Sequence, residues 1–392
     1  MKDDVLVVTP LYKIMGRNDL IQDSDCVHTL VKYWTNDYNV NVLFNYINGF
    51  SKIKNIITPN KMKKILNGYN YDCDNVNVVI SERQNLIPNQ INGNSFDYYV
   101  SKRILKKNNM LKNYKFIVFH LPSTSQFLVN IFSNNKYAIL HQTDLQYLKK
   151  HPTKFKKFLE KNFQKVFCRS KAIHDEVKKF NLKNLDDRII NSGVNTIKLK
   201  NKKVIDTKML KFLYVGKLIK RKNLDLLIKS LSTFDRNTWK LDIIGVGKMN
   251  DEYKKLVSDL KIEKNVCFLG KKSRKEVLKT MEESDVFCMP SVKETLGLVY
   301  LEAMSKGCIT IGTLKEGIDG IIVDSDNGFL VSPNINSLVE CIKKIKKLDK
   351  TKIDKLSRNA IKTALEYNEY DMSKQYLSYI EGENIYDKRC ER

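Results

Sequence analysis

The sequence contains little glycine, proline and histidine, with 16, 7 and 5 of these residues among 392. So little glycine and proline excludes a collagen-like or low-complexity chain. No apolar stretch approaches the roughly 20 residues that a membrane-spanning helix needs. The opening segment MKDDVLVVTP also lacks the basic region of a signal peptide. We therefore expect neither a transmembrane helix nor a secretory leader.

The eight cysteines are scattered along the chain and include no Cys-x-x-Cys pair. Several stand inside apolar runs such as VFCMP and KVFCRS, where cysteine acts as a small hydrophobic residue. This usage is typical of a reducing cytoplasm, and it argues against a disulfide framework or a zinc site. We predict a cytoplasmic protein.

Acidic residues are fewer than basic ones: the chain has 44 Asp and Glu and 69 Lys and Arg, which gives a net charge of +25. Three interpretations of this charge stay open at the level of the sequence. They are contact with nucleic acid, adsorption to anionic lipid, and a drift toward lysine in an AT-rich genome, which the excess of Lys, Asn and Ile favours. No RNA- or DNA-binding motif is present, so we expect no nucleic-acid partner.

Apolar strand-like runs alternate with helix-like periodic segments along most of the chain. This alternation predicts βαβ units and parallel sheets. Two such series are joined by the polar stretch Asn195–Lys208, and the length suits two domains. We predict two Rossmann-like α/β domains at residues 1–195 and 196–370, followed by a helical tail at 371–392 that packs back on the first domain.

The expected elements can be given by residue range. Strands are expected at Val5–Thr9, Val40–Phe44, Val76–Ile80, Phe116–Phe119, Tyr137–Leu140, Val166–Cys168, Arg188–Ile190, Phe212–Val215, Leu241–Ile244, Val266–Leu269, Val286–Met289 and Ile309–Ile311. Helices are expected at His28–Trp34, Ser125–Phe132, Leu224–Leu231, Asp251–Leu260, Lys275–Met281 and Gly297–Ser305. In such open sheets ligands bind beyond the carboxyl ends of the strands, so the residues that follow each strand are the candidate site residues.

The stretch PSVKETLGLVYLEAMSKG, which is Pro290–Gly307, holds two glutamates eight positions apart. Glu294 lies in a loop after a strand, and Gly297 opens the helix that carries Glu302. The free N–H groups at a helix start suit a phosphate, and Glu302 lies about 7.5 Å further along the axis. This scale fits a nucleotide whose diphosphate binds the N–H groups and whose ribose binds Glu302. The alternative is that both glutamates are ordinary surface or capping residues.

This stretch resembles the E-x7-E signature of family 4 of the GT-B glycosyltransferases. Members usually carry Gly or Ser and then Phe after the first glutamate, whereas this chain has Thr295 and Leu296, followed by Gly297 and Leu298. The resemblance implies a GT-B fold of two facing Rossmann-like parallel-sheet domains with the active site in the interdomain cleft. It also implies a nucleotide-diphosphate sugar held by the second domain, and transfer that retains the anomeric configuration.

A second motif, FLYVGKLIKRKNLDLL, places cations directly after a strand that ends at Gly216. Cations at this position neutralise a diphosphate and stabilise it as a leaving group. Members of the family carry Gly-Arg-Leu and then Lys-Gly here, so the resemblance assigns these roles to Lys217 and Lys222. Lys217 lacks the bidentate geometry of arginine, and Asn223 replaces the usual glycine. The alternative is a solvated basic turn.

Further positions follow from the same resemblance. The segment KLDIIGVGKMN carries Gly245 beside the donor, and the loop that begins at Lys271 borders the nucleotide base. His120 follows a strand of the first half, where the family often has a histidine near the transferred sugar. Gly16 lies in the loop that corresponds to the family's Gly-Gly turn near the donor phosphate. His141 also follows a strand and is a weaker candidate.

The prediction is therefore a donor site with three catalytic residues. We expect catalysis by His120, Glu294 and Lys222, and donor binding by Gly16, Gly216, Lys217, Lys222, Gly245, Lys271, Glu294, Thr295, Leu296, Gly297, Leu298 and Glu302. We expect no cofactor and no metal, because the three Asp-x-Asp pairs do not follow suitable strands.

The acceptor is less well specified by the sequence. A glycan or a lipid-linked acceptor of bacterial surface polysaccharide synthesis is the expectation. The segment Tyr147–Phe167 mixes lysine with aromatic and aliphatic residues, and it indicates either contact with an anionic membrane or a helix with a solvated basic face. Two other functions stay open: a non-catalytic GT-B subunit that supports an active enzyme, and a GT-B nucleotide-sugar epimerase.

Overall fold

The computed structural model describes residues 2–13, 25–48, 68–84, 95–133, 135–195 and 205–383. The chain folds as two compact units. Unit 1 comprises residues 1–169, 173–192 and 369–392, and unit 2 comprises residues 170–172 and 193–368. Each unit is built on a mainly parallel sheet, which confirms the predicted α/β class.

Unit 1 contains an eight-stranded sheet in the order β3-β4-β2-β1-β5-β6-β7-β8. Every pairing in it is parallel except that of β3 with β4, which form an antiparallel hairpin. The order reverses between β1 and β5, so the carboxyl ends of these two strands form the switch point of unit 1. The strands are β1 (Asp4–Thr9), β2 (Asn39–Asn48), β3 (Asn70–Cys73), β4 (Val76–Gln84), β5 (Ile117–His120), β6 (Lys136–Leu140), β7 (Lys165–Cys168) and β8 (Leu185–Ile189).

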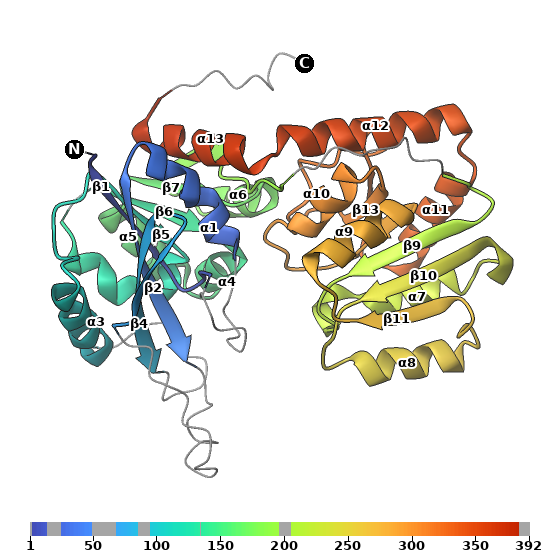
Figure 1. Ribbon diagram of the computed structural model, residues 1–392, viewed down its shortest axis with the longest axis horizontal. Helices are drawn as coiled ribbons and strands as arrows, with labels where there is room; N and C mark the ends of the chain where they lie inside the picture. Colours follow the sequence, from blue (N-terminus) through green and yellow to red (C-terminus); the bar gives the residue numbers. More distant parts are fainter. Residues whose placement is uncertain are drawn as a thin grey trace, which may run out of the picture. The chain divides into compact units, whose positions relative to one another are not determined.

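The sheet of unit 1 is buried on both faces, as expected for parallel strands. Along β1, Val5 and Val7 enter one apolar cluster while Leu6 and Val8 enter the other. Helix α13 (Glu369–Glu381) closes the first of these faces through Tyr376 and its neighbours, alongside α1 (Asp25–Val31) (Figure 1). Residues near the end of the chain therefore complete the core that the first strand begins.

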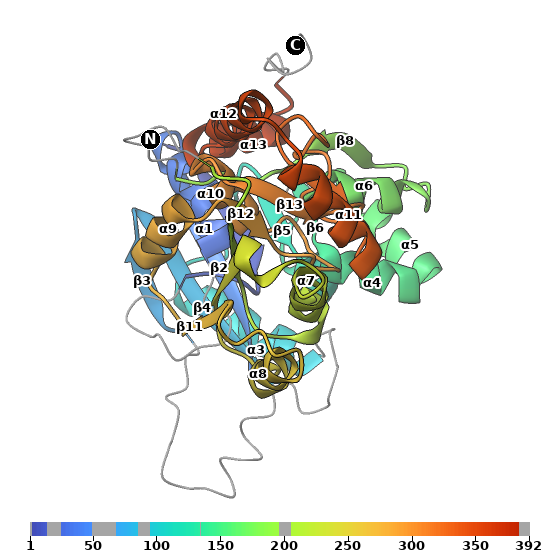
Figure 2. The same cartoon turned by 90° about the vertical axis from the view of Figure 1, so that its right-hand side faces the viewer.

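Unit 2 contains a six-stranded parallel sheet in the order β11-β10-β9-β12-β13-β14. The chain runs outward from β9 to β11 and then returns to build β12 to β14 on the other side of β9. Because parallel crossovers are right-handed, this reversal puts α7 and α8 on one face and α9 and α10 on the other (Figure 2). The strands are β9 (Leu210–Val215), β10 (Trp239–Ile244), β11 (Val266–Gly270), β12 (Val286–Cys288), β13 (Ile309–Thr313) and β14 (Phe329–Val331).

The remaining helices cover these sheets. In unit 1 they are α3 (Ser95–Lys107), α4 (Gln142–Lys150), α5 (Pro152–Asn162) and α6 (Lys171–Lys178). The first two residues of α6 are assigned to unit 2. In unit 2 they are α7 (Leu224–Leu231), α8 (Asn250–Asp259), α9 (Arg274–Glu283), α10 (Leu298–Ser305), α11 (Ile335–Lys346) and α12 (Lys350–Glu366). Among the described residues, no helix has the length and apolar character needed to cross a membrane.

The structure differs from the expected elements in three places. The expected helix Ser125–Phe132 is a 3₁₀ helix, η3 (Gln126–Ile131). The strands β3 and β14 were not predicted, because β3 is a polar edge strand with the sequence NYDC and β14 has only three residues. The chain divides after Ser192 and after Asn368, whereas the sequence suggested boundaries at residues 195 and 370.

Candidate functional site

The strand order of unit 2 reverses between β9 and β12, so the loops that follow these two strands meet at the switch point. Two hydrogen bonds join the loops directly. The backbone N–H of Val292 donates to the carbonyl oxygen of Arg221 at 2.9 Å, and the side-chain amide of Asn223 donates to the carbonyl oxygen of Pro290 at 2.9 Å. Two motifs some seventy residues apart in the sequence therefore form one structure.

Lys222 and Glu294 form an ion pair across this switch point. Only 12% of the Lys222 side chain and 14% of the Glu294 side chain are exposed. Burial lowers the pKa of Lys222 from its ordinary value, and the neighbouring Glu294 carboxylate partly opposes that shift. The guanidinium of Arg221 lies 3.3 Å from the same carboxylate oxygen. The site thus holds one carboxylate between two cations.

The loop after β13 supports the same glutamate from a third strand. The backbone N–H of Glu294 donates to Oε2 of Glu316 at 2.9 Å. A Cβ on Gly317 would lie 2.5 Å from backbone atoms of Thr295 and Leu296, so only glycine permits this close approach. The sequence reasoning missed Glu316 and Gly317. Their position directly after a strand of the parallel sheet was the signal that could have identified them.

Helix α10 begins beside this loop, as predicted. Gly297 has a φ of 78° and caps the helix, and a Cβ there would approach the ring of Tyr300 at 2.7 Å. The N–H groups of the first turn have no acceptor within the helix, and they carry the positive end of its dipole. Both features favour an anion in front of Leu298.

Glu302 lies on α10, and only 6% of the residue is exposed. Its Oε1 pairs with Nη1 of Arg274 at 2.6 Å, although 57% of the Arg274 side chain is exposed. Arg274 is the first residue of α9, whose start is fixed by a capping box between Ser273 and Glu276. Sequence reasoning missed Arg274, because its partner lies on another helix.

The loops after β9 and β10 also touch. A Cβ on Gly245, whose φ is 147°, would lie 1.9 Å from the carbonyl oxygen of Gly216. The glycine pattern of this motif therefore serves backbone contact between two strand ends. Lys217 and Lys271 are exposed at the carboxyl ends of β9 and β11, on the same edge of the sheet.

His120 ends β5 at the switch point of unit 1 and has no exposed surface. Its Nδ1 lies 3.1 Å from Nε2 of His141, and its Nε2 lies 3.1 Å from the hydroxyl of Tyr376. Burial, with a contribution from Arg169, holds the pKa of His120 well below its ordinary value, so the ring is neutral. The catalytic role of His120 stays a prediction, and Gly16 lies outside the described residues.

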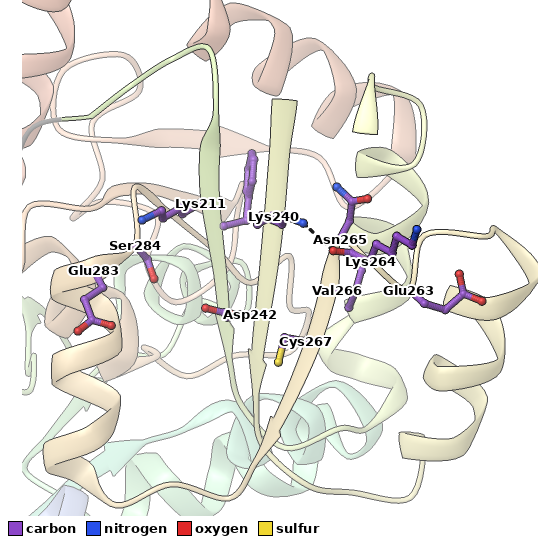
Figure 3. Close-up of a pocket in the computed structure, with 11 residues that line it drawn as sticks. Lys211, Lys240, Asp242, Glu263, Lys264, Asn265, Val266, Cys267, Glu283 and Ser284 are labelled. Atoms are coloured by element: carbon purple, nitrogen blue, oxygen red, sulfur yellow. Dashed lines mark hydrogen bonds between the residues drawn. The ribbon is translucent and has the colours of Figure 1, made fainter. Parts of the chain in front are cut away.

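A pocket of about 440 Å³ lies at the opposite edge of the unit 2 sheet (Figure 3). It is formed at the amino ends of β9, β10 and β11, where Lys240 donates to the carbonyl oxygen of Lys264 at 2.6 Å. Its charged side chains are of both signs: Lys211, Lys240, Lys264, Asp242, Glu263 and Glu283. The pocket lies at the amino ends of the strands, so it is separate from the candidate site at their carboxyl ends, where open parallel sheets bind their ligands.

Comparison with known proteins gives a consistent assignment. Residues 195–364 match the model of the family described as glycosyl transferases group 1. The chain is 29% identical over 242 residues to an uncharacterized glycosyltransferase of Methanocaldococcus jannaschii, covering 60% of this chain and 65% of that protein. It is 30% identical over 216 residues to the N-acetylgalactosamine-N,N'-diacetylbacillosaminyl-diphospho-undecaprenol 4-alpha-N-acetylgalactosaminyltransferase of Campylobacter jejuni, covering 51% and 58%.

The fold is similar to solved structures over almost the whole chain. Sucrose-phosphate synthase of Thermosynechococcus elongatus gives a TM-score of 0.75 at 15% identity, covering 97% of this chain and 98% of that one. HepE of Anabaena, in complex with UDP and glucose, gives 0.68 at 15% identity, covering 97% and 100%. In sequence, by contrast, the chain spans less than two thirds of the length of the curated relatives it matches.

Proposed function

We propose that this chain, of which residues 195–364 match the model of the family described as glycosyl transferases group 1 and which has the GT-B fold, transfers a sugar from a nucleotide-diphosphate sugar to a glycan or lipid-linked acceptor. The transfer retains the anomeric configuration and uses lysine side chains rather than a metal ion to hold the diphosphate. Bacterial surface polysaccharide synthesis is the proposed setting.

The ion pair of Lys222 with Glu294 at the switch point carries this proposal. Lys222 stabilises the diphosphate as it leaves, and the N–H groups at the start of α10 bind the same phosphates. Glu294 accepts hydrogen bonds from hydroxyls of the transferred sugar, and Glu302 accepts them from the ribose. The acceptor attacks the same face of the sugar from which the diphosphate departs, so the departing phosphate oxygen takes the proton of the acceptor hydroxyl.

Two similarities support the substrates proposed. HepE structures contain UDP and UDP-glucose, which supports a nucleotide-sugar donor. The name of the Campylobacter relative includes a diphospho-undecaprenol acceptor, which supports an acceptor linked to a lipid.

A lipid-linked acceptor brings the membrane surface into the proposal. Several aromatic and aliphatic side chains of the Tyr147–Phe167 segment are buried in the protein, among them Leu148, Phe155 and Leu159, which are at most 1% exposed. The exposed side chains of α4 and α5 include Lys150, Lys154, Lys157 and Lys161. We propose that these lysines hold the protein on anionic lipid by charge alone. Binding to vesicles of phosphatidylglycerol should then vanish at high salt, and no binding at low salt would exclude it.

A screen of nucleotide-sugars by thermal unfolding tests the donor proposal. A donor that binds only the folded chain raises the unfolding temperature by mass action. One nucleotide-sugar should stabilise the protein, and addition of acceptor should then yield glycosylated product and nucleoside diphosphate. Stabilisation without turnover, in the presence of a range of acceptors, would favour a non-catalytic subunit. Conversion of the donor to its epimer without acceptor would favour an epimerase.

A further inference from the structure

Three potential metal ligands come together in unit 1. His28 lies on α1, Cys73 ends β3, and Asp74 begins the turn to β4. One ligand atom from each lies within 4.8 Å of the other two. The Nε2 atom of His28 is 3.8 Å from Sγ of Cys73 and 2.7 Å from Oδ2 of Asp74. No sequence motif indicated this group, because the first two ligands are 45 positions apart and match no ligand spacing.

The three groups have the chemistry of a transition-metal site. A thiolate, an imidazole and a carboxylate are the side chains that bind Zn²⁺, whereas Mg²⁺ and Ca²⁺ prefer oxygen ligands alone. Around a tetrahedral Zn²⁺ the ligand atoms stand about 3.3–3.6 Å apart. The separation of 3.8 Å between Sγ and Nε2 is close to this value. The carboxylate must move outward by about 0.6 Å for its oxygen to reach the same distance from Nε2.

The exposure of Asp74 permits that movement, whereas His28 and Cys73 are buried. Cys73 and His28 are 3% and 2% exposed, so the packed core fixes their positions. The Asp74 side chain is 62% exposed and sits in a tight turn, where Asp74 and Asn75 have φ values of 54° and 62°. The thiol and the imidazole therefore form a preformed pair, and the carboxylate swings on the solvent side. A water molecule can take the fourth position there.

Tyr12 completes the arrangement. Its hydroxyl lies 2.9 Å from Nδ1 of His28, and the residue has no exposed surface. Histidines that bind metals usually donate their second ring N–H to an oxygen, which fixes the tautomer. When Nε2 binds a metal, the ring proton sits on Nδ1 and is donated to the oxygen of Tyr12. The nearby charge of Lys13 is balanced by Asp25, whose carboxylate lies 3.9 Å away.

We propose that His28, Cys73 and Asp74 form a binding site for a divalent transition metal, with Zn²⁺ the preferred ion. The ion ties α1 to the β3–β4 hairpin at the edge of the unit 1 sheet. Its role is structural, and the glycosyl transfer proposed above does not depend on it. The alternative is a hydrogen-bonded chain of Tyr12, His28 and Asp74 that holds no metal.

Titration of the metal-free protein with Co²⁺ tests the proposal. A Cys267→Ser background removes an exposed thiol that would bind metal independently. We expect one equivalent of Co²⁺ to produce a near-ultraviolet thiolate-to-cobalt band, which one equivalent of Zn²⁺ then abolishes. Hydrogen exchange should slow in α1 and in the hairpin when Zn²⁺ is added. Absence of the band from the folded protein with its thiols reduced would overturn the proposal.

Variants locate the site. Cys73→Ser should abolish the charge-transfer band, and Asp74→Asn should weaken Co²⁺ binding at least about tenfold. Asp187→Asn is the matched control. It removes a carboxylate that lies 3.1 Å from a histidine, His174, but that is not part of the proposed site. Co²⁺ binding should not change in this variant. Unchanged binding in both Cys73→Ser and Asp74→Asn would overturn the assignment. The titration of the background protein stands on its own if a variant fails to fold.

Discussion

Lys222 and Glu294, which are 72 positions apart in the chain, form a nearly buried ion pair where the strand order of unit 2 reverses. Each charge has lost most of its water, and the Lys222 ammonium depends on the Glu294 carboxylate for compensation. Arg221 and Glu316 add a second cation and a backbone contact to the same loop. The pair therefore links the stability of unit 2 to the position of the groups that we propose bind the donor.

The first prediction concerns the stability of this pair. Glu294→Gln should lower the free energy of unfolding of unit 2 by about 3 kcal/mol, because it leaves the nearly buried Lys222 ammonium without its carboxylate. Lys222→Met should cost less, because Arg221 still pairs with Glu294. The double variant should lose less than the sum of the two. Denaturant titration measures all three values. Lys229→Met is the control, since its pair with Asp225 is 43% and 36% exposed and should contribute little. Additive effects would contradict the coupling.

The second prediction concerns pH. Burial lowers the pKa of Lys222, so its ammonium group loses its proton below the ordinary lysine value of 10.5. The anionic donor favours the protonated form, and its affinity should therefore fall as the pH rises through that lowered pKa. Calorimetric titration across the alkaline range measures this loss. Lys222→Arg should keep its charge and move the loss to higher pH; an identical pH profile in both proteins would exclude Lys222 as the titrating group.

The third prediction concerns the glycines at the strand ends. Gly245→Ala should destabilise unit 2 by several kcal/mol or prevent its folding, because the added Cβ would lie 1.9 Å from a carbonyl oxygen. Gly270→Ala is the matched control. It also has a positive φ, of 68°, but nothing lies within 4 Å of its Cβ, so its cost should be limited to about 1–2 kcal/mol of backbone strain. Thermal unfolding of both variants measures the difference, and equal losses would contradict the proposed contact.

The fourth prediction concerns acid stability of unit 1. Burial would raise the pKa of Asp186, but hydrogen bonds from Arg188 and Lys165 lower it to about 2. A lowered carboxyl pKa gives stability that is present above the ordinary value of 3.8 and is lost as the pH falls toward 2. This contribution is on the order of 2 kcal/mol.

Urea unfolding between pH 2 and pH 6 measures this contribution. Asp186→Asn should remove the part of the pH dependence that Asp186 contributes, and the pH dependence from other shifted carboxyls such as Glu176 should remain. Asp187→Asn, at a neighbouring side chain that is 79% exposed, should leave the contribution of Asp186 intact. A pH profile of Asp186→Asn that matches the unmodified chain would show that another group is responsible.

The sequence predicted most strands of both sheets, because continuous apolar runs such as Val5–Thr9 are typical of strands buried on two faces. It also predicted that Lys222 and Glu294 lie at the same edge of the unit 2 sheet, because the carboxyl ends of parallel strands lie at one edge. It did not predict that Arg221 and Glu316 contact Glu294, or that Arg274 pairs with Glu302. Those contacts depend on how loops from different strands fold together, and no periodicity encodes that.

The sequence also does not predict whether a side chain at the end of a strand is exposed or buried. The sequence placed His120 directly after a strand, and in the structure it is the last residue of β5. A strand end, however, does not reveal whether a side chain faces solvent or lies under another element. Tyr376 comes from 256 positions further along the chain and lies against the His120 ring. Burial by so distant a segment can be read only from the folded protein.

We propose, above all, that Lys222 stabilises the departing diphosphate of a nucleotide-sugar. The most direct test is kcat/KM for sugar transfer by Lys222→Ala, with the donor found by thermal screening, beside the control Lys229→Ala. We predict a loss of at least about 100-fold for Lys222→Ala, with its fold retained by circular dichroism, and less than a twofold change for the control. Near-normal transfer by folded Lys222→Ala would contradict the account.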